Sequence, residues 1–158
     1  MKETLLKYAR YNQWANNKIV NLLTSLASEF IDSEITSSFP TIKKTILHIA
    51  DAELIWHSRL AGTPFPELPS KTGASIESIK DSNKVLIDFI SSKDDAYFAQ
   101  STSYKNLKGE PFASVNNAIF MHVFNHATFH RGQVVSMLRN AGYKAPIEST
   151  DFISFERN

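Results

Sequence analysis

The sequence contains no cysteine among its 158 residues. This absence excludes a disulfide framework, a thiolate metal site and a cysteine nucleophile. The chain also lacks an excess of either charge, because 17 Lys and Arg residues oppose 16 Asp and Glu residues and leave a net charge of +1. Proteins that bind nucleic acid directly carry a basic surface, so we expect no nucleic-acid partner.

Long apolar runs are missing as well. No stretch reaches the roughly 18 uninterrupted apolar residues of a membrane span, and the first residues lack the apolar centre of a secretory signal. We therefore expect a cytoplasmic protein without membrane association. The apolar content of 42% and the length of 158 residues suit one folded unit, so we expect a single domain over residues 1–158.

Four segments carry apolar residues at every third or fourth position, as amphipathic helices do. These segments are Lys2–Leu26, Pro40–Ala61, Ser75–Phe98 (in two pieces) and Ala113–Ala141. Turn residues within Gln100–Phe112 predict a short hairpin between the last two. Four long helices with little else predict an all-α four-helix bundle. The loop of about 13 residues after the second helix spans up to ~43 Å, which is long enough to let the second and third helices run parallel.

Three of the five histidines lie in the fourth predicted helix at steps of four residues: His122, His126 and His130. Each step turns the helix by about 400°, so the three imidazoles form a row on one face. Ile119 and Met137 share that face, which should therefore point into the core. Buried imidazoles need partners, and a shared cation would supply one.

The second predicted helix carries His48 and His57, which lie on opposite sides of it because they are nine residues apart. His48 is the better placed to meet the row. A set of His48, His126 and His130 would supply three nitrogen ligands and leave at least one coordination position open, with His122 as a neighbour. A cluster of structural histidines without metal is the alternative. Ala127 stands where zincin proteases carry their catalytic Glu, which excludes that class.

Three motifs make the chain resemble the DinB/YfiT-like family of metal-dependent four-helix-bundle proteins: YARYNQWANNKI, ILHIADAELIW and HVFNHATFHRGQ. The resemblance implies an up-down-down-up bundle, metal ligands at His48, His126 and His130, zinc or nickel as the metal, and a homodimer. Members of the family often have a histidine directly before the last ligand, where this chain has Phe129.

An open coordination position allows two enzymatic functions, hydrolysis of a carbonyl or related electrophile and transfer of a thiol to an electrophile. The resemblance favours the second, because some DinB-like proteins are thiol S-transferases. Since the chain has no cysteine, a low-molecular-weight thiol would have to arrive as a substrate. Asp51 and Gln133 lie near the histidines, but we expect a solvated Asp and a Gln at the edge of the core rather than a general base. A non-catalytic metal-binding stress-response protein remains the alternative.

The fourth predicted helix is apolar nearly all round, with Phe120, Phe124 and Val135 on the side away from His126. A helix of this kind is buried on more than one side. We predict that this outer face forms a homodimer interface. The alternative is that the C-terminal segment Ile147–Phe155 folds back over it.

Overall fold

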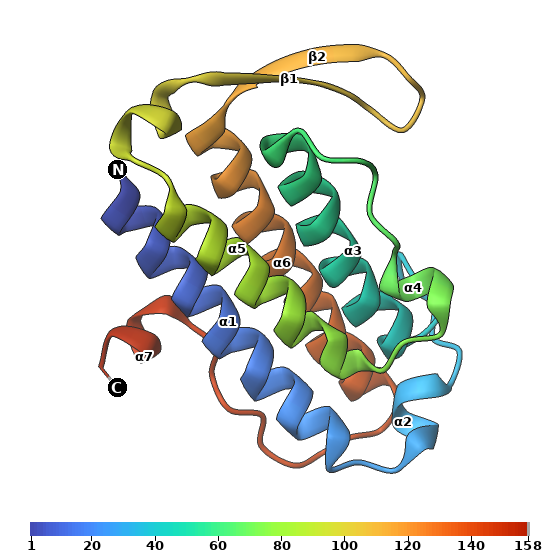
Figure 1. Cartoon of the computed structure of the whole chain (residues 1–158). Coiled ribbons are helices and arrows are strands. Elements are labelled where there is room, and N and C mark those ends of the chain that lie inside the picture. The colour runs from blue at the N-terminus through green and yellow to red at the C-terminus, as the bar shows by residue number, and fades with distance from the viewer. Residues whose placement is uncertain (158) are drawn as a thin grey trace.

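Four long helices lie side by side in the computed structural model, which describes residues 1–157. They are α1 (Lys2–Thr24), α3 (Ile42–Ala61), α5 (Ile79–Ser92) and α6 (Asn116–Asn140). Both α1 and α3 contact α5 and α6, so the four helices enclose a common core. The connection over residues 62–78 leaves α3 and α5 pointing in the same direction (Figure 1). The predicted helical class is confirmed.

A small antiparallel sheet, β1 (Ser101–Lys105) with β2 (Pro111–Val115), covers one end of the helices (Figure 1). The predicted hairpin is therefore present, and its turn is closed by Gly109, which has φ of 84° and donates from its backbone N to Asn106 O over 3.0 Å. The predicted start of the fourth helix was wrong. Ala113 pairs with Ser103 in the sheet, and α6 begins only after β2 ends.

Short helices complete the chain. The sequence predicts only one of them, the second piece of the segment Ser75–Phe98. They are α2 (Ser28–Asp32), α4 (Pro69–Thr72), α7 (Phe152–Glu156) and the 3-10 helices η1 (Ile76–Ser78) and η2 (Asp95–Ala99). Helices this short depend on tertiary contacts for their stability, so periodicity carries little signal for them.

The ends of α3 follow from local chemistry. The Thr41 side chain caps the helix by accepting a hydrogen bond from Lys44 N over 3.1 Å. Pro40, predicted to open the helix, therefore lies just before the cap. Gly62 ends the helix with φ of 66°, a left-handed conformation that glycine adopts without steric cost.

The aromatic residues of α6 are covered by the chain itself. Phe120 is 0% and Phe124 is 3% exposed, and both belong to an apolar cluster that includes residues of α1 and α5. They are not on an outer face, so the reasoning that placed a dimer interface there was wrong. From the C-terminal segment, Phe152 stacks on Tyr8, which also stacks on Phe124. The homodimer itself stays a prediction.

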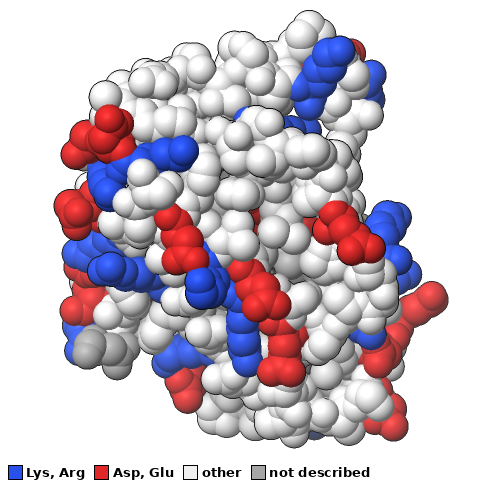
Figure 2. Space-filling model, viewed as in Figure 1, with Lys and Arg blue, Asp and Glu red and all other residues white. Residues whose placement is uncertain are grey.

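Charged side chains of both signs are interspersed over the face shown in Figure 2. Two ion pairs tie α1 to the C-terminal segment, Lys7 with Glu156 and Lys18 with Glu148, each over 2.5 Å. None of the helices within residues 1–157 is both long enough and apolar enough to cross a membrane.

Candidate metal centre

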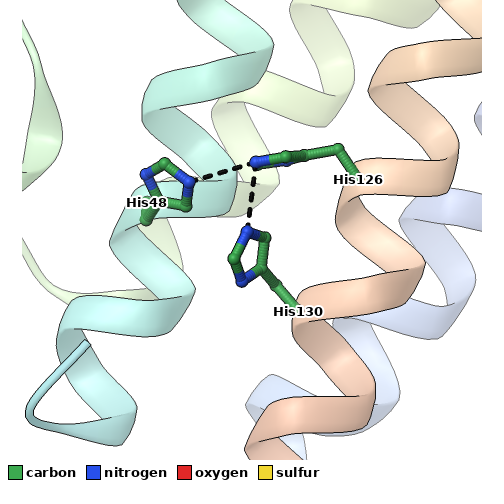
Figure 3. A group of neighbouring side chains, drawn as sticks. All are labelled: His48, His126 and His130. Atoms are coloured by element: carbon green, nitrogen blue, oxygen red, sulfur yellow. Dashed lines mark hydrogen bonds between the residues drawn. The ribbon is translucent and has the colours of Figure 1, made fainter. Parts of the chain in front are cut away.

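The three histidines predicted as ligands converge between α3 and α6 (Figure 3). His48 comes from α3, while His126 and His130 lie one turn apart on α6. The His126 Nε2 atom is 3.0 Å from His48 Nε2 and 3.1 Å from His130 Nε2. One ring nitrogen from each residue lies within 4.8 Å of the others, so the three atoms surround a common point.

This arrangement suits a cation better than hydrogen bonds alone. A neutral imidazole nitrogen carries either one proton or one lone pair, so His126 Nε2 cannot form a full hydrogen bond with both neighbours. Ligand nitrogens about 2.0–2.1 Å from a metal lie roughly 2.8–3.4 Å apart in octahedral to tetrahedral sites. The separations of 3.0 and 3.1 Å fall in this range, and the donor set therefore fits a divalent cation.

The three imidazoles are held in their neutral, ligating form. Burial lowers the pKa of His126 to about 4, assisted by repulsion from the other histidines of the site and from His122. Burial also lowers the pKa of His48, with His130 adding to the effect and Asp51 opposing it. Burial lowers the pKa of His130, and the hydrogen bond that its ring donates to Gln133 acts in the opposite direction. At neutral pH the site can therefore bind a cation without first releasing protons.

Neighbouring side chains orient His130 and His48. The Gln133 Oε1 atom lies 2.7 Å from His130 Nδ1, so Nδ1 carries the proton and the Nε2 lone pair faces the site. Gln133 Nε2 in turn donates to Ser38 Oγ over 2.8 Å, and the Phe39 ring lies 4.3 Å from the His48 ring. Ser38 and Phe39 precede α3, and no periodic pattern in the sequence pointed to them.

The sequence profile of the DinB family matches residues 1–157. The chain belongs to the DinB family. Protein DinB of Bacillus subtilis (strain 168) is 30% identical to it over 156 residues, which cover 90% of this chain and 89% of that protein. The crystal structure of a DinB-like protein from Bacillus cereus ATCC 10987 matches its fold with a TM-score of 0.65 at 22% identity, over 93% of this chain and 97% of the other.

Two further residues of α3 in this DinB-family chain, Asp51 and His57, lie in different surroundings. Asp51 is only 6% exposed and accepts a hydrogen bond from Ser70 N over 3.1 Å, so the prediction of a solvated carboxylate was wrong. This contact ties α4 to α3. His57 packs against Phe89 of α5, with ring centres 4.9 Å apart, and it takes no part in the histidine group.

An aromatic row extends from the histidines of this DinB-family chain toward the hairpin. The His122 ring lies 6.0 Å from that of His126 and 5.3 Å from that of Trp56. Trp56 contacts Tyr104 of β1 at 5.0 Å, and the Arg59 guanidinium lies 4.4 Å from the Trp56 ring centre. His122 therefore lies beside the three converging histidines. The contribution of Trp56 and Tyr104 was not predicted, because it joins segments distant in sequence.

Proposed function

We propose that His48, His126 and His130 bind one divalent cation, zinc or nickel, and that the protein is a metal-dependent enzyme. The observation that carries this proposal is the convergence of three ring nitrogens within 4.8 Å, with His126 Nε2 lying 3.0 Å from His48 Nε2 and 3.1 Å from His130 Nε2. Three protein ligands favour a reactive over a purely structural site, since structural zinc has four. When bound, a divalent cation on three neutral imidazoles retains its full charge and lowers the pKa of a coordinated water or thiol.

The proposed reaction is transfer of a small-molecule thiol to an electrophile. The thiol would lose its proton to solvent, its sulfur would bond to the electrophilic carbon, and the leaving group would depart. The chain has no cysteine, so the thiol comes as a substrate. Hydrolysis is less well supported, because Asp51 is buried and accepts a hydrogen bond from the Ser70 backbone N–H, which leaves no evident general base for an attacking water.

In this proposal the protein side chains hold and shield the site. Gln133 keeps the His130 lone pair directed at the site. Phe39 packs on the His48 ring and excludes water from one side. We also assign the four long helices to an up-down-down-up bundle. This topology is supported by the chain directions in Figure 1, where α1 and α6 run downward and α3 and α5 run upward.

Elemental analysis of untagged protein tests the metal site. We expect about one metal ion per chain in the wild type, and its loss in His48→Ala, His126→Ala and His130→Ala. His57→Ala is the matched control, because His57 lies on the same helix as His48 but outside the histidine group. A wild type without metal, or site variants that retain as much metal as His57→Ala, would refute the proposal.

The reaction is tested with metal-loaded protein, a panel of small thiols and a fluorogenic alkyl bromide. Turnover that requires both thiol and metal supports S-transfer, whereas metal-dependent cleavage of esters without thiol supports hydrolysis. Bound metal without turnover in either assay would favour the alternative, a non-catalytic metal-binding protein. Sedimentation velocity tests the predicted homodimer separately.

A further inference from the structure

Five buried polar side chains form a closed loop of hydrogen bonds across the four long helices. We call them the polar layer: Asn12 and Asn16 of α1, Glu53 of α3, Asn83 of α5 and Arg131 of α6. Each is at most 2% exposed. The layer contains an acidic side chain, Glu53, and a basic one, Arg131, and asparagine side chains connect the two.

The loop closes through five contacts. Arg131 donates to Asn12 Oδ1 over 2.6 Å and to Asn16 Oδ1 over 2.8 Å. Asn12 Nδ2 donates to Glu53 Oε1 over 2.7 Å, and Asn83 Nδ2 donates to Glu53 Oε2 over 2.7 Å. Asn16 Nδ2 completes the loop by donating to Asn83 Oδ1 over 3.2 Å. Each asparagine therefore uses both ends of its amide within the layer.

The polar layer interrupts an otherwise apolar core. On α1, for example, Ala9 belongs to one apolar cluster and Ile19 to another, and Asn12 and Asn16 lie between them. Burying an acid and a base gives little or no net stability compared with apolar side chains of similar size. Directional hydrogen bonds do, however, select one arrangement of the helices, which apolar contacts select only weakly.

The two helices that carry the histidine group also carry the charged members of the layer. Arg131 directly follows His130, and Glu53 comes five residues after His48. At about 100° per residue, ligand and layer side chains point about 100° apart on α6 and about 140° apart on α3. Each helix thus presents one face to the metal site and another to the polar layer.

We infer that the polar layer positions the metal site, by fixing the register and rotation of α3 against α6 at which His48 Nε2 lies 3.0 Å from His126 Nε2. This inference rests on the proposed metal site. Metal–ligand distances must be met to within about 0.2 Å, so small shifts between the two helices weaken binding even where the fold persists. The members of the layer are positioning residues and touch no ligand atom of the site.

Asn83→Ala is the variant of choice, because it opens the loop from α5 and alters neither ligand-bearing helix. The matched control is Ile90→Ala, also on α5 and fully buried, which removes apolar packing without touching the layer. Replacing Glu53 or Arg131 by Ala leaves a buried charge unpaired and risks unfolding. Should Asn83→Ala fail to fold, Asn16→Ala opens the same link from α1.

Binding of Co²⁺ is measured by its d–d absorption, with circular dichroism to establish that each variant is folded. We expect Asn83→Ala to bind Co²⁺ about tenfold or more weakly and with an altered spectrum, while Ile90→Ala keeps the wild-type affinity and spectrum. Wild-type binding by Asn83→Ala, or equal changes in Ile90→Ala, would overturn the positioning role alone. Failure of the wild type to bind Co²⁺ would overturn the metal site and this inference together.

Discussion

The Glu53 carboxyl predicts an unusual dependence of stability on pH. Complete burial raises its pKa from 4.5 to about 7, although hydrogen bonds from Ser82, Asn12 and Asn83 and the charge of Arg131 act in the opposite direction. A neutral Glu53 is accommodated by Ser82 Oγ, which lies 2.5 Å from Glu53 Oε2 and 3.0 Å from the Ile79 carbonyl oxygen. The protonated Glu53 carboxyl then donates a hydrogen bond to Ser82 Oγ, and the Ser82 hydroxyl donates one to the Ile79 carbonyl oxygen.

The folded state holds this proton more tightly than the unfolded state does. The contribution of Glu53 to the free energy of unfolding is therefore complete below pH 4.5 and is lost as the pH rises through about 7. An increase of the pKa from 4.5 to about 7 corresponds to about 3 kcal/mol, at about 1.36 kcal/mol per pH unit. Glu53→Gln removes the titrating group and with it this dependence.

Urea unfolding of the wild type and Glu53→Gln, with a chelator present, measures the effect. The free energy of unfolding of the wild type minus that of the variant should fall by about 3 kcal/mol between about pH 4 and pH 8. The subtraction cancels the contribution of the buried histidines, which has the opposite sign because their pKa values are lowered. A difference that is constant or rises with pH would show that folding does not raise the pKa of Glu53, because its hydrogen-bond donors balance or outweigh burial.

Three further predictions concern the site and the fold. Because the pKa values of His48, His126 and His130 all lie below the ordinary value of 6.5, cation affinity measured by calorimetry should change little between about pH 8 and 7; a tenfold fall per pH unit over this range would contradict this. Phe98→Ala, at a fully buried position, should lower the free energy of unfolding in urea by about 3–5 kcal/mol, and a loss below about 1 kcal/mol would show that Phe98 is not part of the core. Thr41→Ala removes the cap of α3 and should lower the free energy of unfolding, measured by thermal unfolding, by about 1 kcal/mol. Thr41→Ser keeps a hydroxyl at the cap and should retain most of this free energy.

Periodicity located the long helices well but not their ends. The start of α6 was placed at Ala113, because the apolar pattern continues backward through residues that in fact form β2. Ala113 is held in the sheet by its pairing with Ser103, ten residues earlier. The turn residues predict the hairpin, but helical periodicity does not show how far its second strand extends, and strand pairing overrides helical propensity at Ala113.

The interpretation of α6 as an interface helix failed for a related reason. A helix that is apolar on most sides is buried on most sides, but its sequence does not identify what buries it. Phe120 and Phe124 pack within the chain, in a cluster shared with α1 and α5. Asp51 was misjudged in the same way, since Ser70 of the following segment covers it.

The histidine row and the absence of thiolate ligands follow from the sequence alone. Four-residue spacing places His126 and His130 on one face of any α-helix, so their proximity is a local property. The approach of His48 Nε2 to within 3.0 Å of His126 Nε2, across 78 residues of chain, depends instead on how α3 packs against α6. The same packing brings Glu53 and Arg131 into one buried layer, because directional contacts between four helices depend on an arrangement that no single helix encodes.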